Sequence, residues 1–356
     1  MKVLHLPYST GGNSWGLACG ERAIGLDSKV LTIDKNWLDY PTDICLNIDV
    51  KERYKLPYNI IKLFSTFLKI RNKYDVFHFN SGASLIDFAN YKMPLFELPF
   101  YPKDKKIIFT YNGCDIRQKY PTMKRVTFAA CHEKECYSGV CNSGKIDEIR
   151  RQKIKIVEKY AHHIFALNPD LLYFLPEKAT FLPYTVARWE EIERVYKPID
   201  NVINIVHSPT NRVTKGSKFI IDAVTELQKK YTNINLIMVE KMPHNEALEV
   251  YKNAHIIIDQ VLIGWYGGFA VEAMKMGKPV GVFIREEDLK FLPDGMAKDL
   301  KDAVINMNPF TIKDTLELYL QNPSLLKQKS EASLAYVNKW HDPKYIAGIT
   351  KSVYES

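Results

Sequence analysis

Short apolar runs rich in β-branched residues alternate with longer segments of helical periodicity along the whole chain. The runs predicted to be buried strands are 2–9, 29–33, 75–80, 106–112, 163–167, 202–208, 234–240, 255–259 and 279–283. The segments between them are predicted to be helical, and the longest extends from about Lys145 to His162. Continuous apolar strands that alternate with helices are typical of parallel sheets covered on both faces. The pattern therefore predicts an α/β fold with doubly wound, Rossmann-like sheets.

The strand pattern stops between two halves of the chain. Prolines punctuate residues 176–200, and the polar stretch 187–201 has no strand pattern. A chain of 356 residues also exceeds the usual size of a single hydrophobic core. We therefore expect an N-terminal domain over 1–185 and a C-terminal domain over 200–334, with the terminal helix 335–356 packing back on the first. If these domains face each other, the carboxyl ends of both sheets meet at one cleft, where ligands bind in such folds.

Composition and charge exclude several classes of protein. Apolar residues make up 46% of the chain and charged residues 25%, as in ordinary globular proteins. No apolar stretch is long enough for a transmembrane helix, and the N-terminus reads as a first strand more than as a signal peptide. We expect a cytoplasmic protein, in which six cysteines are more often thiols or ligands than disulfides. The net charge of +8 favours anionic partners, but no nucleic-acid-binding motif is present, so we expect no nucleic acid partner.

A glycine-rich segment, IGWYGGFAVEAMKMGKPV, connects two predicted strands of the second domain. Gly264, Gly267 and Gly268 would free the backbone for positive φ and close approach to a ligand, and the helix would begin at Phe269. Glu272 would then lie in the first turn, where the helix dipole stabilises a carboxylate that can accept hydrogen bonds from two ribose hydroxyls. A plain tight turn followed by a dipole-stabilised glutamate explains the same residues equally well.

The run VEAMKMGKPV resembles the donor-site motif EAMAxGxPV of retaining GT-B glycosyltransferases, in the family-four group of sucrose synthase and glycogen synthase. The resemblance implies a GT-B fold of two Rossmann-like domains facing across a cleft, and a nucleotide-diphosphate sugar as donor. It assigns the ribose contact to Glu272 and contacts with the diphosphate or sugar to the loop amides. The family motif has a second glutamate that contacts the transferred sugar, where this chain has Gly264. Asp259 and Gln260 are the nearest polar candidates to replace it.

A basic segment, HSPTNRVTKG, follows the first strand of the second domain and begins at His207. It resembles the family segment in which an arginine and a lysine grip the diphosphate, which implies these roles for Arg212 and Lys215. The alternative is a solvated loop, although a lysine at a helix start opposes the helix dipole. Because fixed cations can stabilise the departing diphosphate, the resemblance implies a metal-independent reaction without a cofactor.

The first domain carries weaker signals on the predicted acceptor side. Gly11 and Gly12 follow the first strand, where GT-B enzymes place a glycine loop near the donor phosphates and the acceptor. His78 is expected to end a strand at the edge of the cleft, where family members often have histidine, although a single histidine is more often structural.

The segment TYNGCDIR resembles the family segment Thr-x-His-Gly-x-Asp, with Asn112 at the histidine position. An amide can hydrogen-bond a sugar hydroxyl but cannot carry a proton. Asp115 and Arg117 are predicted either to bind the acceptor or to form an ion pair with each other.

Two further segments have unusual composition. Cys131, Cys136 and Cys141 repeat every five residues, with Cys114 upstream; zinc ligands are usually closer in sequence, so thiols are favoured over a structural metal. Residues 51–73 contain seven basic residues and one acidic residue beside an apolar face. Such a helix can lie on an anionic membrane surface or simply cover the sheet. The apolar loop MPLFELPFYP could touch lipid or the isoprenoid of an acceptor.

Together with these patterns, the resemblance implies a hexosyltransferase that moves a sugar from a UDP- or GDP-sugar to a glycan or lipid-linked acceptor. The resemblance further implies retention of configuration and a role in bacterial surface polysaccharide assembly, at the inner face of the membrane. Two alternatives stay open. A nucleotide-sugar 2-epimerase would need an acid and a base that the sequence does not reveal, and a non-catalytic GT-B module would bind glycan or nucleotide and assist a partner.

Overall fold

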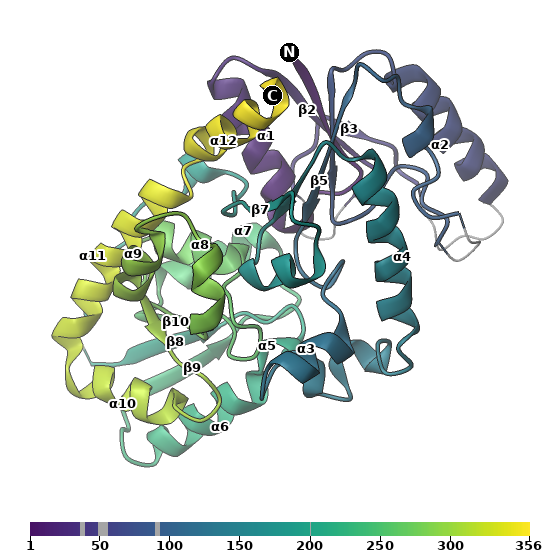
Figure 1. Ribbon diagram of the computed structural model, residues 1–356. Coiled ribbons are helices and arrows are strands. Elements are labelled where there is room, and N and C mark those ends of the chain that lie inside the picture. The colour runs from purple at the N-terminus through teal and green to yellow at the C-terminus, as the bar shows by residue number, and fades with distance from the viewer. Residues whose placement is uncertain (36–39, 49–55, 90–92, 200) are drawn as a thin grey trace. The chain divides into compact units, whose positions relative to one another are not determined.

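The computed structural model describes residues 1–35, 40–48, 56–89, 93–199 and 201–356 (Figure 1). The chain forms two compact units. The first contains residues 1–118, 145–187 and 342–356, and the second contains residues 119–144 and 188–341.

The first unit contains a seven-stranded sheet in which every neighbouring pair of strands is parallel. Its strands are β1 (Lys2–Leu6), β2 (Asp27–Thr32), β3 (Ile44–Cys45), β4 (Val76–Asn80), β5 (Lys106–Tyr111), β6 (His163–Ala166) and β7 (Ala179–Phe181). Their order across the sheet is β3-β2-β1-β4-β5-β6-β7. The strand order therefore reverses between β1 and β4, as in Rossmann-like sheets.

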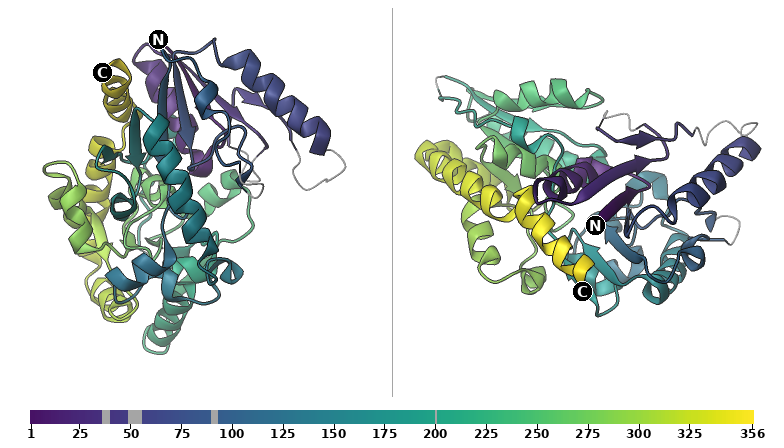
Figure 2. Two further views of the ribbon diagram at one scale, coloured as in Figure 1. Left: turned by 45° about the vertical axis from the view of Figure 1, so that its right-hand side comes forward. Right: turned by 90° about the horizontal axis from the view of Figure 1, so that it is seen from above.

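Helices cover both faces of this sheet. They are α1 (Asn13–Ala23), α2 (Leu56–Ile70), α4 (Lys145–Tyr160) and α12 (Pro343–Glu355). Successive strand residues point to opposite faces, so Val3 packs in a cluster with residues of α1 and α12, whereas Leu4 packs with residues of α2 and α4. Helices α1 and α12 lie side by side, although they come from opposite ends of the chain (Figures 1 and 2). The predicted doubly wound arrangement is confirmed.

The second unit contains a five-stranded parallel sheet in the order β12-β11-β10-β8-β9. Its strands are β8 (Ile203–His207), β9 (Ile234–Met238), β10 (Ile256–Ile258), β11 (Val280–Val282) and β12 (Val304–Asn306). Its helices are α3 (Lys119–Arg125), α5 (Arg212–Lys215), α6 (Ser217–Gln228), α7 (His244–Lys252), α8 (Gly268–Lys275), α9 (Met296–Ala303), α10 (Ile312–Gln321) and α11 (Pro323–Trp340). The strand order reverses between β8 and β10, and ligands bind at the carboxyl ends of the strands at such a point.

Each strand predicted from the apolar runs is present in the two sheets. The strands that the sequence analysis missed are β3, β7 and β12, which have only two or three residues each. Strands β10 and β11 are equally short, but each lies in a longer apolar run, whereas polar residues interrupt the sequence around β3, β7 and β12.

The two units divide the chain differently from the predicted ranges. Residues 119–144, which the prediction included in the first domain, belong to the second unit. Three contacts tie this segment to the second unit. The backbone amide of Ala130 donates to the carbonyl of Leu262, a guanidinium nitrogen of Arg125 lies 3.0 Å from Asp288, and the sulfur of Cys136 lies 3.4 Å from the hydroxyl of Thr214.

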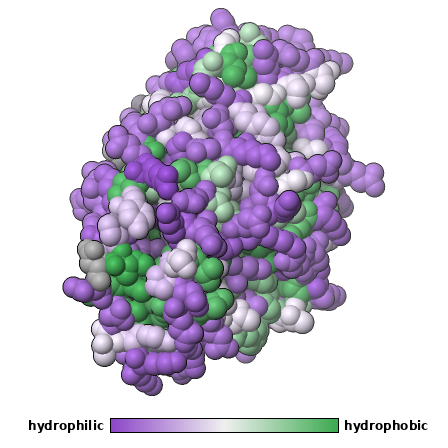
Figure 3. Space-filling model, turned by 90° about the vertical axis from the view of Figure 1, so that its left-hand side faces the viewer, coloured by the Kyte–Doolittle hydropathy of each residue, from purple (hydrophilic) through white to green (hydrophobic). Residues whose placement is uncertain are grey.

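No helix among the described residues is both long enough and apolar enough to cross a membrane. Figure 3 shows one face of the molecule, on which hydrophobic side chains gather in small groups among hydrophilic ones.

Candidate functional site

An ion pair lies at the carboxyl ends of β8 and β10 in the second unit. The ammonium group of Lys215, at the end of α5, donates to one carboxylate oxygen of Asp259 at 2.6 Å. The backbone amide of Gly267 donates to the other oxygen at 2.7 Å. The Asp259 side chain is fully buried and that of Lys215 is 13% exposed. A cation and a backbone amide therefore converge on one anionic group at the point where the strand order reverses.

The local sequence positions Lys215. Asn211 caps α5, because its side-chain oxygen accepts from the amide of Thr214 at 2.9 Å. Gly216 ends the helix with a φ of +76°, a left-handed conformation that favours glycine. This short, capped helix holds the lysine facing the loop that follows β10.

The predicted ribose ligand, Glu272, lies in α8. The helix begins at Gly268, so Glu272 is its fifth residue, and the prediction that it lies in the first turn is wrong. The side chain is 5% exposed, and one carboxylate oxygen lies 2.8 Å from Nε2 of His244, the first residue of α7. Nearby, the Phe269 ring packs on the Tyr251 ring with centroids 4.8 Å apart. The second unit thus places a buried carboxylate beside a histidine and two aromatic rings.

The glycines of the loop have different conformations. Among the three, positive φ occurs at Gly264, where φ is +90°. Gly267 is extended and caps α8, and Gly268 is helical, so the prediction of positive φ is wrong for these two. The side-chain amide of Gln260 donates to the carbonyl of Trp265 and braces the loop from within.

Arg212 and His207 occupy different environments. The Arg212 guanidinium is 57% exposed and makes a two-pronged ion pair with Glu240, which lowers the pKa of that carboxyl group.

His207 is fully buried as the last residue of β8. Its Nδ1–H donates to the carbonyl of Ile258, and its Nε2 accepts from the hydroxyl of Ser217. Burial lowers the pKa of His207 to about 4, so this ring is neutral and ties β8 to β10 and α6.

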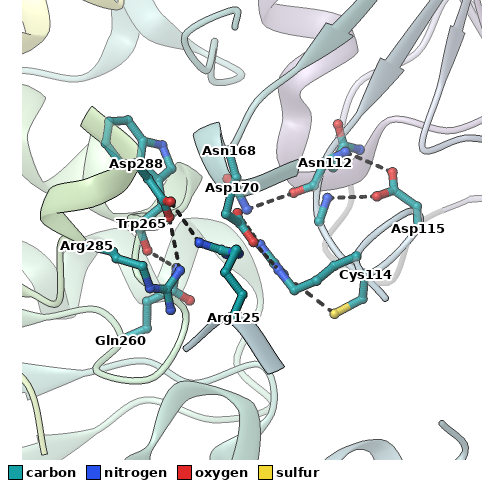
Figure 4. Close-up of polar contacts among 12 residues, drawn as sticks. Asn112, Cys114, Asp115, Arg125, Asn168, Asp170, Gln260, Trp265, Arg285 and Asp288 are labelled. Atoms are coloured by element: carbon teal, nitrogen blue, oxygen red, sulfur yellow. Dashed lines mark hydrogen bonds and ion pairs between the residues drawn. The ribbon is translucent and has the colours of Figure 1, made fainter. Parts of the chain in front are cut away.

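In the first unit, Asn112 and Asp115 form a turn after β5 (Figure 4). The Asp115 carboxylate accepts from the amides of Asn112 and Gly113, both at 2.8 Å. The side-chain amide of Asn112 donates to the hydroxyl of Ser81 at 2.8 Å, and its buried side-chain oxygen has no hydrogen-bond partner. Desolvation raises the pKa of Asp115 despite the two amides. The turn therefore offers one buried amide oxygen that a hydroxyl could satisfy.

Arg117 is buried and makes a two-pronged ion pair with Asp170, with distances of 2.6 and 2.8 Å. The structure therefore gives Arg117 an ion-pair partner, Asp170, that the sequence analysis did not consider. Local sequence could not identify Asp170, because it lies 53 residues further along the chain.

His78 lies in the middle of β4, and the prediction that it ends a strand is wrong. Its Nδ1–H donates to the hydroxyl of Tyr354 at 2.7 Å, and Nε2 accepts from the hydroxyl of Thr110 at 2.6 Å. Burial lowers its pKa far below the usual value. The Tyr354 hydroxyl donates in turn to Glu21 at 2.7 Å, so His78 belongs to a buried network that attaches α12 to the sheet.

The first glycine loop packs tightly against its own unit. Gly11 and Gly12 both have positive φ, and a Cβ atom on Gly12 would lie 2.8 Å from the Cβ of Ala187. Gly12 is therefore required for packing, whatever the loop binds.

Among the described residues, no cysteine belongs to a group of three potential metal ligands. One group of three such side chains is found in the part of the chain that the structure describes. It consists of His5, Glu21 and His78, whose potential ligand atoms lie within 4.8 Å of one another. These residues are fully buried in the first unit, and Nε2 of His5 lies 2.8 Å from Glu21.

Helix α2 carries residues 56–70 of the predicted basic segment, and residues 51–55 lie outside the described residues. Its side chains in the core include Leu63, Phe67 and Ile70. Its most exposed apolar side chains are Tyr58, Ile61 and Leu68, at 60–67% exposure. The apolar residues therefore cover the sheet and also form an outward-facing stripe.

The sequence analysis did not identify three residues of the candidate site. Glu240, His244 and Arg285 reach it from the segments after β9 and β11. No motif marks them, because each is selected by a contact between distant segments.

No known protein-family profile matches the chain, and no curated protein sequence matches it. Solved structures match over almost the whole length. Sucrose-phosphate synthase from Thermosynechococcus elongatus aligns over 100% of this chain and 98% of its own, with 13% identity and a TM-score of 0.62. A glycosyltransferase from Rickettsia africae aligns over 99% and 97%, with 13% identity and a TM-score of 0.60.

This chain has the GT-B fold. A protein from Listeria monocytogenes assigned as a UDP-N-acetylglucosamine 2-epimerase matches as well, over 100% and 97%, with 12% identity and a TM-score of 0.54. At such low identity the likeness concerns the fold, which two kinds of enzyme share. The particular activity has to be argued from the residues of the site.

Proposed function

We propose that this GT-B protein is a glycosyltransferase that moves a sugar from a UDP- or GDP-sugar to a glycan or lipid-linked acceptor. One observation carries the proposal: Lys215 and the amide of Gly267 converge on a single carboxylate at the switch point of the second sheet. The same ammonium and amide can hold a diphosphate once Asp259 gives up part of these contacts. Amides at a helix N-terminus together with a cation are a common phosphate site.

The proposed roles follow from this placement. Lys215, with the exposed Arg212 at the other end of α5, would stabilise the negative charge that develops on the departing diphosphate. Glu272 would accept hydrogen bonds from the ribose hydroxyls. The buried side-chain oxygen of Asn112 would accept from a sugar hydroxyl. The motif resemblance supports retention of configuration, with the departing phosphate accepting the proton of the acceptor hydroxyl.

A ligand screen tests the nucleotide site. UDP or GDP is expected to raise the melting temperature in proportion to the logarithm of its concentration, because a ligand that binds only the folded state stabilises it. UMP and GMP are matched controls, and they should stabilise less because they lack the second phosphate. A melting temperature that neither diphosphate changes at millimolar concentration would contradict the proposal.

The epimerase is a second candidate, because the likeness to solved structures extends to one. The two activities differ in their products. A transferase releases nucleoside diphosphate only when an acceptor is present, whereas an epimerase converts the nucleotide sugar without an acceptor. A non-catalytic module would bind nucleotide and do neither.

We also propose that α2 attaches the protein to an anionic membrane surface. Ile61 and Leu68 lie seven residues apart and so on one side of the helix, with Lys62 and Lys69 next to them. Arg71, just after α2, donates to the carbonyl of Phe100 at 3.4 Å, and the residue Phe100 is itself 50% exposed. The apolar loop 93–102 therefore continues this surface. Exposed apolar side chains bordered by lysines are typical of helices that lie at a lipid interface.

The double variant Ile61→Ser/Leu68→Ser is expected to bind vesicles containing phosphatidylserine at least about tenfold more weakly, because two apolar side chains no longer enter the interface. Vesicle co-sedimentation measures the change. Leu318→Ser, at another half-exposed leucine, should have no effect. Equal binding by the double variant and the natural protein would exclude α2 as the attachment surface.

A further inference from the structure

A buried arginine occupies the space beside Gly264 in the loop that follows β10. The backbone amide of Arg285 donates to the carbonyl of Gly264 at 3.0 Å. A Cβ atom built on Gly264 would lie 2.6 Å from one terminal nitrogen of the Arg285 guanidinium and 2.9 Å from the other. The guanidinium therefore fills the volume that any side chain at position 264 would need.

The contacts of Arg285 leave part of its guanidinium unsatisfied. Its side chain is 4% exposed, and one terminal nitrogen donates to Asp288 at 3.0 Å. The second oxygen of Asp288 accepts from Arg125 at 3.0 Å, so one carboxylate serves two guanidinium groups (Figure 4). A second acidic residue, Glu287, has a side chain that is 57% exposed, and one of its carboxylate oxygens lies 3.7 Å from Nε of Arg285.

The other terminal nitrogen of Arg285, Nη2, is buried and has no hydrogen-bond partner. A buried charged donor without an acceptor is strongly unfavourable. Such a group calls for an acceptor that the surrounding side chains do not supply.

The Arg285 guanidinium, which comes from the segment after β11, packs against the loop that contributes to the proposed diphosphate site. Gly264 stands three residues before Gly267, whose amide shares the Asp259 carboxylate with Lys215. The transferred sugar of a nucleotide sugar is joined directly to the diphosphate and must lie next to it. Two cations therefore flank this loop: Lys215 beside Gly267, where the diphosphate is proposed to bind, and Arg285 beside Gly264, on the part of the loop proposed to face the attached sugar.

We infer that the transferred sugar carries a carboxylate. The donor is then a nucleotide-activated uronic acid, whose carboxylate is recognised by Arg285. This inference rests on the proposed glycosyltransferase function and narrows its donor. A carboxylate matches the planar fork of a guanidinium and accepts charge-assisted hydrogen bonds from it. Gly264 is explained at the same time, because any side chain there would displace the arginine.

Matched pairs of donors test the inference with the natural protein. UDP-glucose and UDP-glucuronic acid differ only at carbon 6, as do UDP-galactose and UDP-galacturonic acid, and GDP-mannose and GDP-mannuronic acid. Isothermal titration should show that at least one acid binds about 10- to 100-fold more tightly than its neutral partner, the range expected for a hydrogen bond to a charged group. Neutral sugars that bind as tightly as the acids in all three pairs would overturn the inference.

Two variants separate recognition of the carboxylate from support of the loop. Arg285→Gln should lose the preference for the acid while binding of UDP or GDP alone changes little, and Arg285→Lys should keep part of the preference. Arg125→Gln is the control, because it removes the other contact to Asp288 and should keep the preference. If Arg285→Gln weakens the binding of nucleoside diphosphates as much as the binding of the acid nucleotide sugars, the arginine only supports the loop and the inference is wrong.

The binding data also distinguish this inference from the proposed function. If the natural protein binds UDP or GDP but shows no preference for acid sugars, the uronic acid inference fails and the proposed function stands. If it binds neither diphosphate, both fail.

Discussion

A Glu272→Ala variant is expected to bind its nucleoside diphosphate about 100-fold more weakly than the natural protein, with little change in folding. The proposed role gives Glu272 two hydrogen bonds from the ribose hydroxyls, and hydrogen bonds to charged groups contribute about 1.5–3 kcal/mol each. Since 1.4 kcal/mol corresponds to a factor of ten, the loss of both bonds accounts for a factor of about 100 or more. Isothermal titration with UDP and GDP measures this change.

Two controls distinguish the ribose contact from a structural role of Glu272. Glu272→Gln keeps the shape of the side chain and should bind with intermediate affinity. His244→Ala removes the residue that holds the Glu272 carboxylate at 2.8 Å, and it should weaken binding less than tenfold because the carboxylate is retained. Unchanged nucleotide affinity in Glu272→Ala would refute the ribose assignment. A large fall in its melting temperature would show instead that the residue supports the fold.

Replacement of Lys215 should slow sugar transfer even when the donor is saturating. The ammonium would stabilise charge that appears only as the bond to the sugar breaks, and removal of one such group typically lowers kcat by about 100- to 1000-fold. Steady-state release of nucleoside diphosphate in the presence of acceptor measures the effect. A rate equal to that of the natural protein would exclude Lys215 from stabilising the leaving group.

The variant must be chosen so that folding does not obscure the result. Lys215 is paired with the fully buried Asp259, and removal of one partner of a buried ion pair destabilises proteins by about 3–5 kcal/mol. In the double variant Lys215→Met/Asp259→Asn, no charge is left buried alone. This variant should therefore fold well and still transfer sugar slowly. Asp259→Asn alone keeps the ammonium, which is 13% exposed, and should lose much less activity at temperatures below its own melting transition.

The convergence of Lys215 and the glycine loop could be anticipated from local sequence. Each belongs to a recognisable strand–loop–helix segment, and 44 residues separate Lys215 from Asp259. Strands β8 and β10 are parallel neighbours, so the residues that follow them meet at one edge of the sheet. A prediction that also made these two strands neighbours would have placed the two residues near each other.

Other residues could not be placed in this way. His78 and His207 both stand in or after apolar runs, and nothing in these runs shows that both nitrogens of each ring are engaged inside the unit. The partners come from distant segments, including the last helix of the chain. The assignment of residues 119–144 to the second unit depends likewise on contacts with loops that lie far along the chain.

The alternation of apolar runs and helical segments determined the α/β class, the strands long enough to show a pattern, and the segments from which a nucleotide site could be built. These features depend on local periodicity and on short motifs, which are properties of neighbouring residues. Only the tertiary structure decided which charges are paired, that Arg285 fills the space beside Gly264, and that one of its nitrogens has no partner. The physical reason is that the environment of a buried charge is set by side chains from several distant segments, and no local pattern records which of them meet.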